Sequence, residues 1–136
     1  MDWIQQHIVN IMIGILIFWL LWKRLIAPKL SGVKSMSATD YHQFRNEAHT
    51  LLDVRSDSEW QSGHPSTAIH IELRQISQRM DELSKDKALV VICASGNRSA
   101  MAATKLANAG FEPVYNFSGG MGSWQGAGLP IKKGAF

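Results

Sequence analysis

The residue types best suited to chemistry occur together in one short segment, Cys93 to Ser99, which reads C-A-S-G-N-R-S. A cysteine becomes a nucleophile as its thiolate. Gly96 permits a tight turn, so the backbone N–H groups that follow Cys93 can point inward, and Arg98 adds a full positive charge. Such a nest favours thiolate over thiol and can hold an anionic sulfur species. The segment therefore predicts a nucleophilic cysteine in an anion-binding loop.

Each of these residues also has a structural alternative. A free cysteine is often a small core residue, an arginine often joins a surface ion pair, and Ser99 has the side chain of a helix N-cap. A core role accounts for Cys93 at the end of an apolar run, but not for Gly96 and Arg98 at this spacing. We therefore expect Cys93 to act as the nucleophile, and Ser99 to belong to the loop as well as to cap a helix.

The flanking elements place this segment at one edge of a sheet. Residues 88–92 form an unbroken apolar run with β-branched side chains, which is typical of a strand buried on both faces. Residues 99–109 are rich in alanine and precede Gly110, which predicts a helix and its end. In open parallel sheets, ligands bind beyond the carboxyl ends of the strands, and Cys93 follows directly after such a strand.

Strands and helices are expected to alternate along the rest of the chain. Apolar, β-branched runs predict strands at residues 33–36, 50–54, 68–71 and 114–117. An imperfect capping box at residues 37–40 starts a predicted helix over 38–47, and helical spacing predicts another over 76–83. This alternation predicts an α/β fold in which helices cover both faces of a parallel sheet.

The start of the chain is strongly apolar. Residues 11–22 carry no charge, and the run from Ile4 to Trp22 spans roughly 28 Å as a helix, close to the ~30 Å hydrocarbon core of a bilayer. Tryptophans lie near both of its ends. A cleaved signal peptide would have Lys or Arg before the run and a small-residue cleavage site after it, and a core helix would have a polar face. We expect an uncleaved transmembrane anchor at residues 1–25.

The net charge of +3 is confined to the region around this anchor. Four basic residues lie between positions 23 and 34, whereas ten basic and ten acidic side chains cancel from residue 35 onward. A nucleic-acid-binding domain carries positive charge on its fold, so no nucleic-acid partner is expected. Basic residues after the anchor predict a single-pass protein of the inner (cell) membrane whose C-terminal domain is cytoplasmic. A lone cysteine also suits a reducing compartment.

Four segments, in order, resemble signatures of the rhodanese-type sulfurtransferases. Residues 93–98 resemble the active-site loop of the family, C-x-x-G-x-R, and residues 51–64 (L-L-D-V-R-S-D-S-E-W-Q-S-G-H) resemble its first signature. Residues 110–124 resemble the second signature of the family, and residues 128–130 (G-L-P) resemble the end of its domain. The resemblance covers about residues 33–131 and implies a five-stranded parallel sheet with helices on both faces, here preceded by one transmembrane helix. We expect a basic linker at 26–34, the rhodanese domain at 35–131 and a tail at 132–136.

The chain departs from the family pattern in one place. After Gly63 and His64, four residues around the expected third strand replace an aliphatic residue, a glycine, an asparagine and a proline of the pattern; they are Pro65, Thr67, His70 and Glu72. These replacements leave open the local backbone and the partner contacts of that strand. They lie away from the cysteine loop.

The resemblance also implies the roles of individual residues. Cys93 would attack the outer sulfur of a donor such as thiosulfate, become a persulfide and pass the sulfur to an acceptor such as cyanide or a protein thiol. Substrate binding would fall to the six residues that follow: Ala94, Ser95, Gly96, Asn97, Arg98 and Ser99. Asp53, Arg55 and Glu59 would be structural, with Arg55 pairing with Glu59 across a turn. No metal and no other cofactor is implied.

Two other functions remain as alternatives. Some phosphatases use Cys and Arg around an anion in a C-x5-R loop, but Cys93 and Arg98 are one residue closer, which makes a smaller cradle. A membrane-anchored binding module with weak or no catalysis is the second alternative, favoured by the altered segment 65–72 and disfavoured by the intact loop. The five histidines show no metal-ligand spacing.

Overall fold

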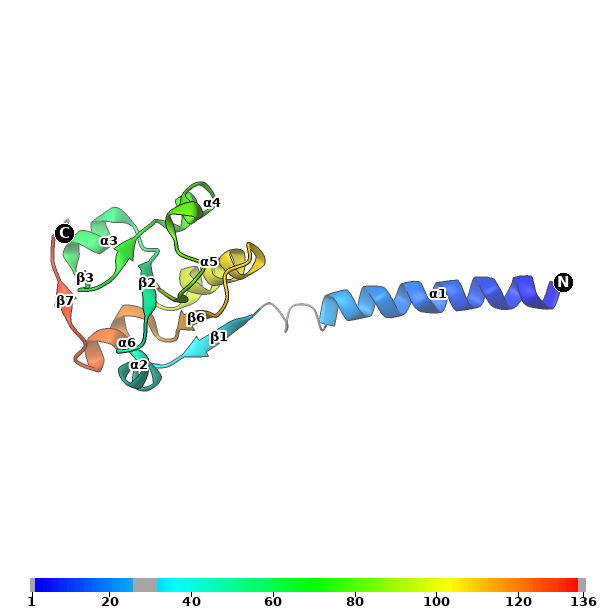
Figure 1. Cartoon of the computed structure of the whole chain (residues 1–136), viewed down its shortest axis with the longest axis horizontal. Helices are drawn as coiled ribbons and strands as arrows, with labels where there is room; N and C mark the ends of the chain where they lie inside the picture. Colours follow the sequence, from blue (N-terminus) through cyan, green and yellow to red (C-terminus); the bar gives the residue numbers. More distant parts are fainter. Residues whose placement is uncertain (1, 26–31, 135–136) are drawn as a thin grey trace. The chain divides into compact units, whose positions relative to one another are not determined.

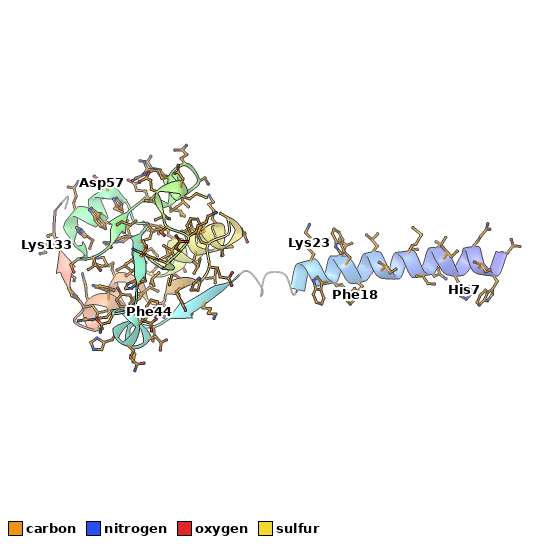
Figure 2. The ribbon with its side chains drawn as sticks, in the orientation of Figure 1. His7, Phe18, Lys23, Phe44, Asp57 and Lys133 are labelled. Atoms are coloured by element: carbon orange, nitrogen blue, oxygen red, sulfur yellow. The ribbon has the colours of Figure 1, made fainter. Side chains whose placement is uncertain are left out.

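A computed structural model describes residues 2–25 and 32–134 of the 136-residue chain as two compact units, residues 1–31 and residues 32–136. The first unit contains the helix α1 (Asp2–Leu25). Residues 2–23 have a mean hydropathy of 1.8, and α1 is long and apolar enough to cross a membrane. Figure 2 shows His7, Phe18 and Lys23 projecting from it along its length. Residues 26–31 of the expected linker lie outside the described residues.

The second unit is built on the parallel sheet that the sequence predicts (Figure 1). Its strand order is β1-β6-β5-β2-β4, and every pair in it is parallel. The strands are β1 (Val33–Met36), β2 (His49–Asp53), β4 (Ile69–His70), β5 (Ala88–Ile92) and β6 (Val114–Phe117). The strands β3 (His64–Pro65) and β7 (Ile131–Lys132) form a separate antiparallel pair.

Helices cover both faces of this sheet, so the α/β prediction is confirmed. They are α2 (Ala38–Phe44), α3 (Asp57–Ser62), α4 (Ile76–Arg79), α5 (Asn97–Asn108) and α6 (Gly120–Gly126), with short 3₁₀ helices at Leu73–Gln75 and Met80–Glu82. Because side chains alternate along each strand, the buried residues form two clusters. Leu52, Leu89 and Val91 face α4 and α5 in one, and Leu51, Val90 and Ile92 face α2 and α6 in the other. Figure 1 shows α2 and α6 together on their side of the sheet.

Several predicted boundaries differ from the structure. The capping box at Ser37 and Asp40 is present, but α2 ends at Phe44 rather than at residue 47, because the chain turns there into β2. The predicted helix over 76–83 keeps α-helical geometry for only one turn and continues as 3₁₀. The strand predicted at residues 33–36 is β1, with the same bounds, and its first residue Val33 pairs with Val114, so residues 33 and 34 of the expected linker belong to the sheet.

Candidate active site

The loop between β5 and α5 holds the sulfur of Cys93 inside a ring of backbone groups. Cys93 has no exposed surface. Its Sγ accepts the N–H of Gly96 at 3.0 Å and lies 3.3 Å from the Oγ of Ser99. Gly96 adopts a φ of +103°, a left-handed conformation that favours glycine and turns the backbone back toward the sulfur. Ala94, Ser95 and Asn97 are exposed and form the rim.

The surroundings of the sulfur favour its ionised form. Burial by itself raises the pKa of the Cys93 thiol, because a charge is poorly solvated there. Hydrogen bonding between the sulfur and the Ser99 hydroxyl, and hydrogen bonds from the backbone N–H groups of Ser99, Ser95 and Gly96, act in the opposite direction and together outweigh burial. The pKa of Cys93 is therefore below its usual range, and the nest expected from the sequence is present.

The start of α5 differs from the expectation for Ser99. The helix begins at Asn97, so Gly96 is the N-cap and Ser99 lies inside the first turn. Ser99 is fully buried, and its hydroxyl faces the sulfur instead of capping the helix. The prediction that Ser99 caps the helix is wrong, whereas its place in the loop follows from the contact with Cys93.

Arg98 is held by a carboxylate from another element. Its Nη1 and Nη2 donate to the two carboxylate oxygens of Glu59, on α3, at 2.7 and 2.9 Å. This hydrogen bond from Arg98 is the main reason why the pKa of Glu59 falls to about 2. These two parallel hydrogen bonds connect the loop to α3, and the carboxylate of Glu59 neutralises the charge of Arg98.

The predicted pair between Arg55 and Glu59 is wrong. Arg55 instead turns back to Asp53 at the end of β2, with Nη2 and Oδ2 2.8 Å apart, and both side chains are buried. The same Nη2 donates to the carbonyl oxygen of Gly63 at 2.6 Å. Asp53 and Arg55 are thus a structural pair, which fixes the chain between β2 and β3. Glu59 is left to meet Arg98.

Two residues outside the loop contact it in ways that the sequence did not indicate. Asn116, on β6, accepts a hydrogen bond from the Ser99 hydroxyl at 2.5 Å and donates one from Nδ2 to the carbonyl oxygen of Gly96 at 3.3 Å. Gly120, at the start of α6, lies directly against the backbone carbonyl groups of Cys93 and Ala94, where a Cβ would be 2.4 Å from the carbonyl carbon of Ala94. A polar residue inside an otherwise apolar strand and the Gly119-Gly120 pair were the available signals.

The altered segment 65–72 has partners of its own in the structure. Pro65 pairs with Ile131 between β3 and β7. The ring of His70 stacks on Trp60 at 4.7 Å, and its Nε2 hydrogen-bonds the carbonyl oxygen of Arg55 at 2.7 Å. His64 stacks on Trp60 at 3.5 Å and is buried, as expected for a structural residue.

One cavity of about 260 Å³ lies apart from the cysteine loop. Aromatic and apolar side chains alternate with polar ones around it, and no residue from 93 to 99 lines it. The lining residues are Tyr41, Arg45, His49, Leu51, Ser66, Thr67, Trp124, Leu129 and Pro130. Over residues 2–25 and 32–134, no three His, Cys, Asp or Glu side chains are grouped so as to hold a metal ion.

Comparisons with known proteins agree with this architecture. The rhodanese-like domain family matches residues 37–127. The chain is 34% identical over 87 residues to thiosulfate sulfurtransferase GlpE from Actinobacillus pleuropneumoniae, which covers 64% of this chain and 81% of that protein. It is 42% identical over 80 residues to the putative sulfurtransferase YtwF from Bacillus subtilis, covering 59% of this chain and 77% of that one.

A solved structure shows the same fold. The crystal structure of a rhodanese-related protein from Thermoplasma volcanium matches with a TM-score of 0.68 at 34% identity, over 73% of this chain and 97% of that one. The family match begins at Ser37, after α1 and β1. With the sheet, the cysteine loop and these matches in agreement, the chain belongs to the rhodanese-like family of sulfurtransferases.

Proposed function

We propose that this protein is a membrane-tethered sulfurtransferase that moves sulfane sulfur through a persulfide on Cys93. The observation that carries the proposal is the position of the only cysteine, whose sulfur receives the Gly96 N–H at 3.0 Å and lies 3.3 Å from the Ser99 hydroxyl. These contacts stabilise negative charge on sulfur, which is the form that attacks.

The reaction has two halves. The Cys93 thiolate attacks the outer sulfur of a donor such as thiosulfate; a new S–S bond forms, the old one breaks, and sulfite leaves with the electron pair. The terminal sulfur of the persulfide then carries the negative charge. An acceptor such as cyanide or a thiolate attacks that sulfur, and the electron pair of the S–S bond returns to Cys93. No outside oxidant or reductant is needed.

The loop residues divide into those that bind through the backbone and one that acts through its side chain. Residues 94–99 bind the substrate sulfur, chiefly through the backbone N–H groups of Ser95, Gly96 and Ser99, which hydrogen-bond the Cys93 sulfur and are held in place before the reaction begins. Arg98 closes the loop through its ion pair with Glu59. Its main role is therefore to hold the loop in place, and not to attract the donor as an unpaired cation. A cradle of this size suits one sulfur better than a tetrahedral phosphate, which favours sulfur transfer over phosphatase chemistry.

The membrane part of the proposal rests on α1 and its flank. The helix is long and apolar over Asp2–Lys23, and basic residues gather at its C-terminal end and beyond it, which supports a catalytic domain on the cytoplasmic side. Cys93 is the only cysteine in these 136 residues, so a thiol acceptor belongs to another molecule. That acceptor must reach a sulfur attached at the bottom of the loop.

The test is to detect the intermediate and its transfer. After incubation with thiosulfate, mass spectrometry should find about 32 Da added to Cys93, and cyanide should remove it and release thiocyanate. Cys93→Ser should neither take up sulfur nor turn over. Absence of the adduct with a range of sulfane donors, in a protein whose circular dichroism shows it folded, would favour the membrane-anchored binding module instead.

A further inference from the structure

The hydroxyl of Ser99 lies between two groups that can each accept its hydrogen bond. Its Oγ is 3.3 Å from the Sγ of Cys93 and 2.5 Å from the Oδ1 of Asn116. A hydroxyl has a single hydrogen to donate, and Ser99 is fully buried, so water supplies no substitute. Ser99 can therefore donate to the sulfur or to Asn116, but not to both.

The orientation of the Asn116 amide follows from its second partner. Nδ2 donates to the carbonyl oxygen of Gly96 at 3.3 Å. A carbonyl oxygen can only accept, so the NH₂ end of the amide must face Gly96 and Oδ1 must face Ser99. Asn116 is opposite Val91 in the sheet register, which sets it beside the end of β5 from which the cysteine loop departs.

The direction of the Ser99 hydrogen bond thus depends on the charge of the sulfur. A Cys93 thiol donates its S–H to Ser99 Oγ, and Ser99 donates onward to Asn116. A thiolate has no hydrogen and needs donors, so the Ser99 hydroxyl must rotate toward it. Oδ1 of Asn116, a partly buried residue, then loses its hydrogen bond from Ser99, and this loss opposes ionisation.

We propose that Asn116 is a positioning residue for sulfur transfer, which takes the Ser99 hydrogen whenever the Cys93 sulfur is uncharged and gives it up to the thiolate. This inference rests on the proposed persulfide chemistry. When the thiolate attacks the donor, its negative charge moves to the terminal sulfur of the persulfide, and Ser99 returns to Asn116. When the acceptor removes that sulfur, the electron pair comes back to Cys93 and Ser99 turns to it again.

The other charged groups near the loop are locked in pairs. Arg98 is bound to Glu59, and Arg55 to Asp53. The imidazole of His70 hydrogen-bonds the carbonyl oxygen of Arg55 and stacks on Trp60. A change in the ionisation of Cys93 caused by Asn116 is therefore separable from these groups, because none of them contacts Asn116 through a hydrogen bond in the described residues.

The experiment measures the pH at which the thiolate of Cys93 forms, from its ultraviolet absorbance in the full-length protein in detergent, with Cys93→Ser as the blank. Cys93 is the only cysteine, so the signal has one source. Asn116→Leu has the shape of asparagine but neither accepts nor donates. It leaves Ser99 free to donate to the sulfur, so the midpoint should fall by about one pH unit, the size of one hydrogen bond.

Ser99→Ala provides the matched control, because it removes the hydroxyl and should raise the midpoint. In the Ser99→Ala background, Asn116→Leu should no longer lower it, since Asn116 acts only through Ser99. A merely structural role predicts the opposite sign: loss of the bond to Gly96 would loosen the loop, weaken the N–H contact to sulfur and raise the midpoint. A midpoint that is unchanged or raised in Asn116→Leu therefore overturns the inference.

The test does not depend on the folding of one particular variant, nor on whether Cys93 forms a persulfide. If Asn116→Leu does not fold, Asn116→Ala carries the same expected fall in midpoint. The titration needs no sulfur donor, so it gives an answer even if Cys93 forms no persulfide. A lowered midpoint without any sulfur adduct would keep the Asn116–Ser99 coupling and refute the proposed function, and an adduct with an unchanged midpoint would do the reverse.

Discussion

Replacing Gly120 by alanine should disrupt the cysteine loop from outside it. A Cβ on Gly120 would lie 2.4 Å from the carbonyl carbon and oxygen of Ala94 and 2.5 Å from the carbonyl oxygen of Cys93. Ordinary contact begins near 3.4 Å, so the two backbones must separate by about 1 Å. The obstacle is backbone on both sides, and no flexible side chain can yield. Gly120 also has a φ of +57°, which costs an alanine about 1 kcal/mol.

The two effects add to a definite magnitude. Overpacking of this kind costs about 1–3 kcal/mol, so the total loss in the free energy of unfolding is about 2–4 kcal/mol. For a domain of this size that corresponds to a fall in Tm on the order of 10–20 °C. The separation also pulls on the hydrogen bond from the N–H of Met121 to the carbonyl oxygen of Cys93, now 2.9 Å long. The rate of thiocyanate formation should therefore fall by more than the loss of folded protein alone would cause.

Gly122 provides the matched control for this prediction. It lies in the same helix, its φ is not in the left-handed region, and no atom is within 4 Å of a Cβ built there. Gly122→Ala should be neutral or raise the stability by about 0.5–1 kcal/mol, because alanine favours helix over glycine. Thermal unfolding and thiocyanate release are measured for both variants. If Gly120→Ala matches Gly122→Ala in Tm and in rate, the close packing of α6 on the loop is not what holds the site.

Three further predictions follow from other parts of the molecule. The pKa of Glu59 is lowered from 4.5 to about 2 by its bond to Arg98, so the folded carboxylate contributes stability that is present above pH 4.5 and lost as the pH falls toward 2. Since both side chains are about a third exposed, this contribution to the free energy of unfolding is about 1 kcal/mol. Glu59→Gln should therefore remove the corresponding part of the pH dependence of the urea midpoint. An unaltered pH dependence in that variant would count against a contribution from the Arg98–Glu59 pair. A reporter fused after residue 136 should be active as a cytoplasmic fusion, and activity only in the periplasm would reverse the proposed orientation. A fragment starting at Gly32 should fold and remain soluble, because residues 32–136 have their own core and equal numbers of acidic and basic side chains from residue 35 onward, whereas aggregation of that fragment would show that residues 1–31 are needed.

The strands and the nucleophile could be predicted because their signals are local. The apolar runs 88–92 and 114–117 became β5 and β6 with the expected bounds. An unbroken apolar run followed at once by a glycine-containing turn fixes where a strand ends, and with it the position of Cys93. The end of α2 was missed by three residues, because the turn into β2 depends on where β2 must pair.

Side-chain partners were harder to predict because they depend on distances across the fold. Arg55 and Glu59 are four positions apart, which suggested a pair, yet Arg55 meets Asp53 two positions earlier. Glu59 meets Arg98, which is 39 positions away in the chain. Asn116 comes to Ser99 only because β6 lies beside β5 in the sheet. The order of strands in the sheet, which periodicity does not encode, decides such contacts.

The bidentate bond between Arg98 and Glu59 has a consequence for how substrates reach the sulfur. With Arg98 paired to Glu59 and Arg55 paired to Asp53, neither arginine remains as an unpaired cation to accelerate the encounter with an anion. Recognition rests on short-range backbone donors, which act at contact and are little affected by the ion atmosphere. The rate of sulfur uptake should therefore depend only weakly on ionic strength. Because the arginines are paired, the entrance to the loop does not favour anionic sulfur donors over uncharged ones by charge. The shape of a donor, and whether its sulfur can reach Cys93, should decide which donors react.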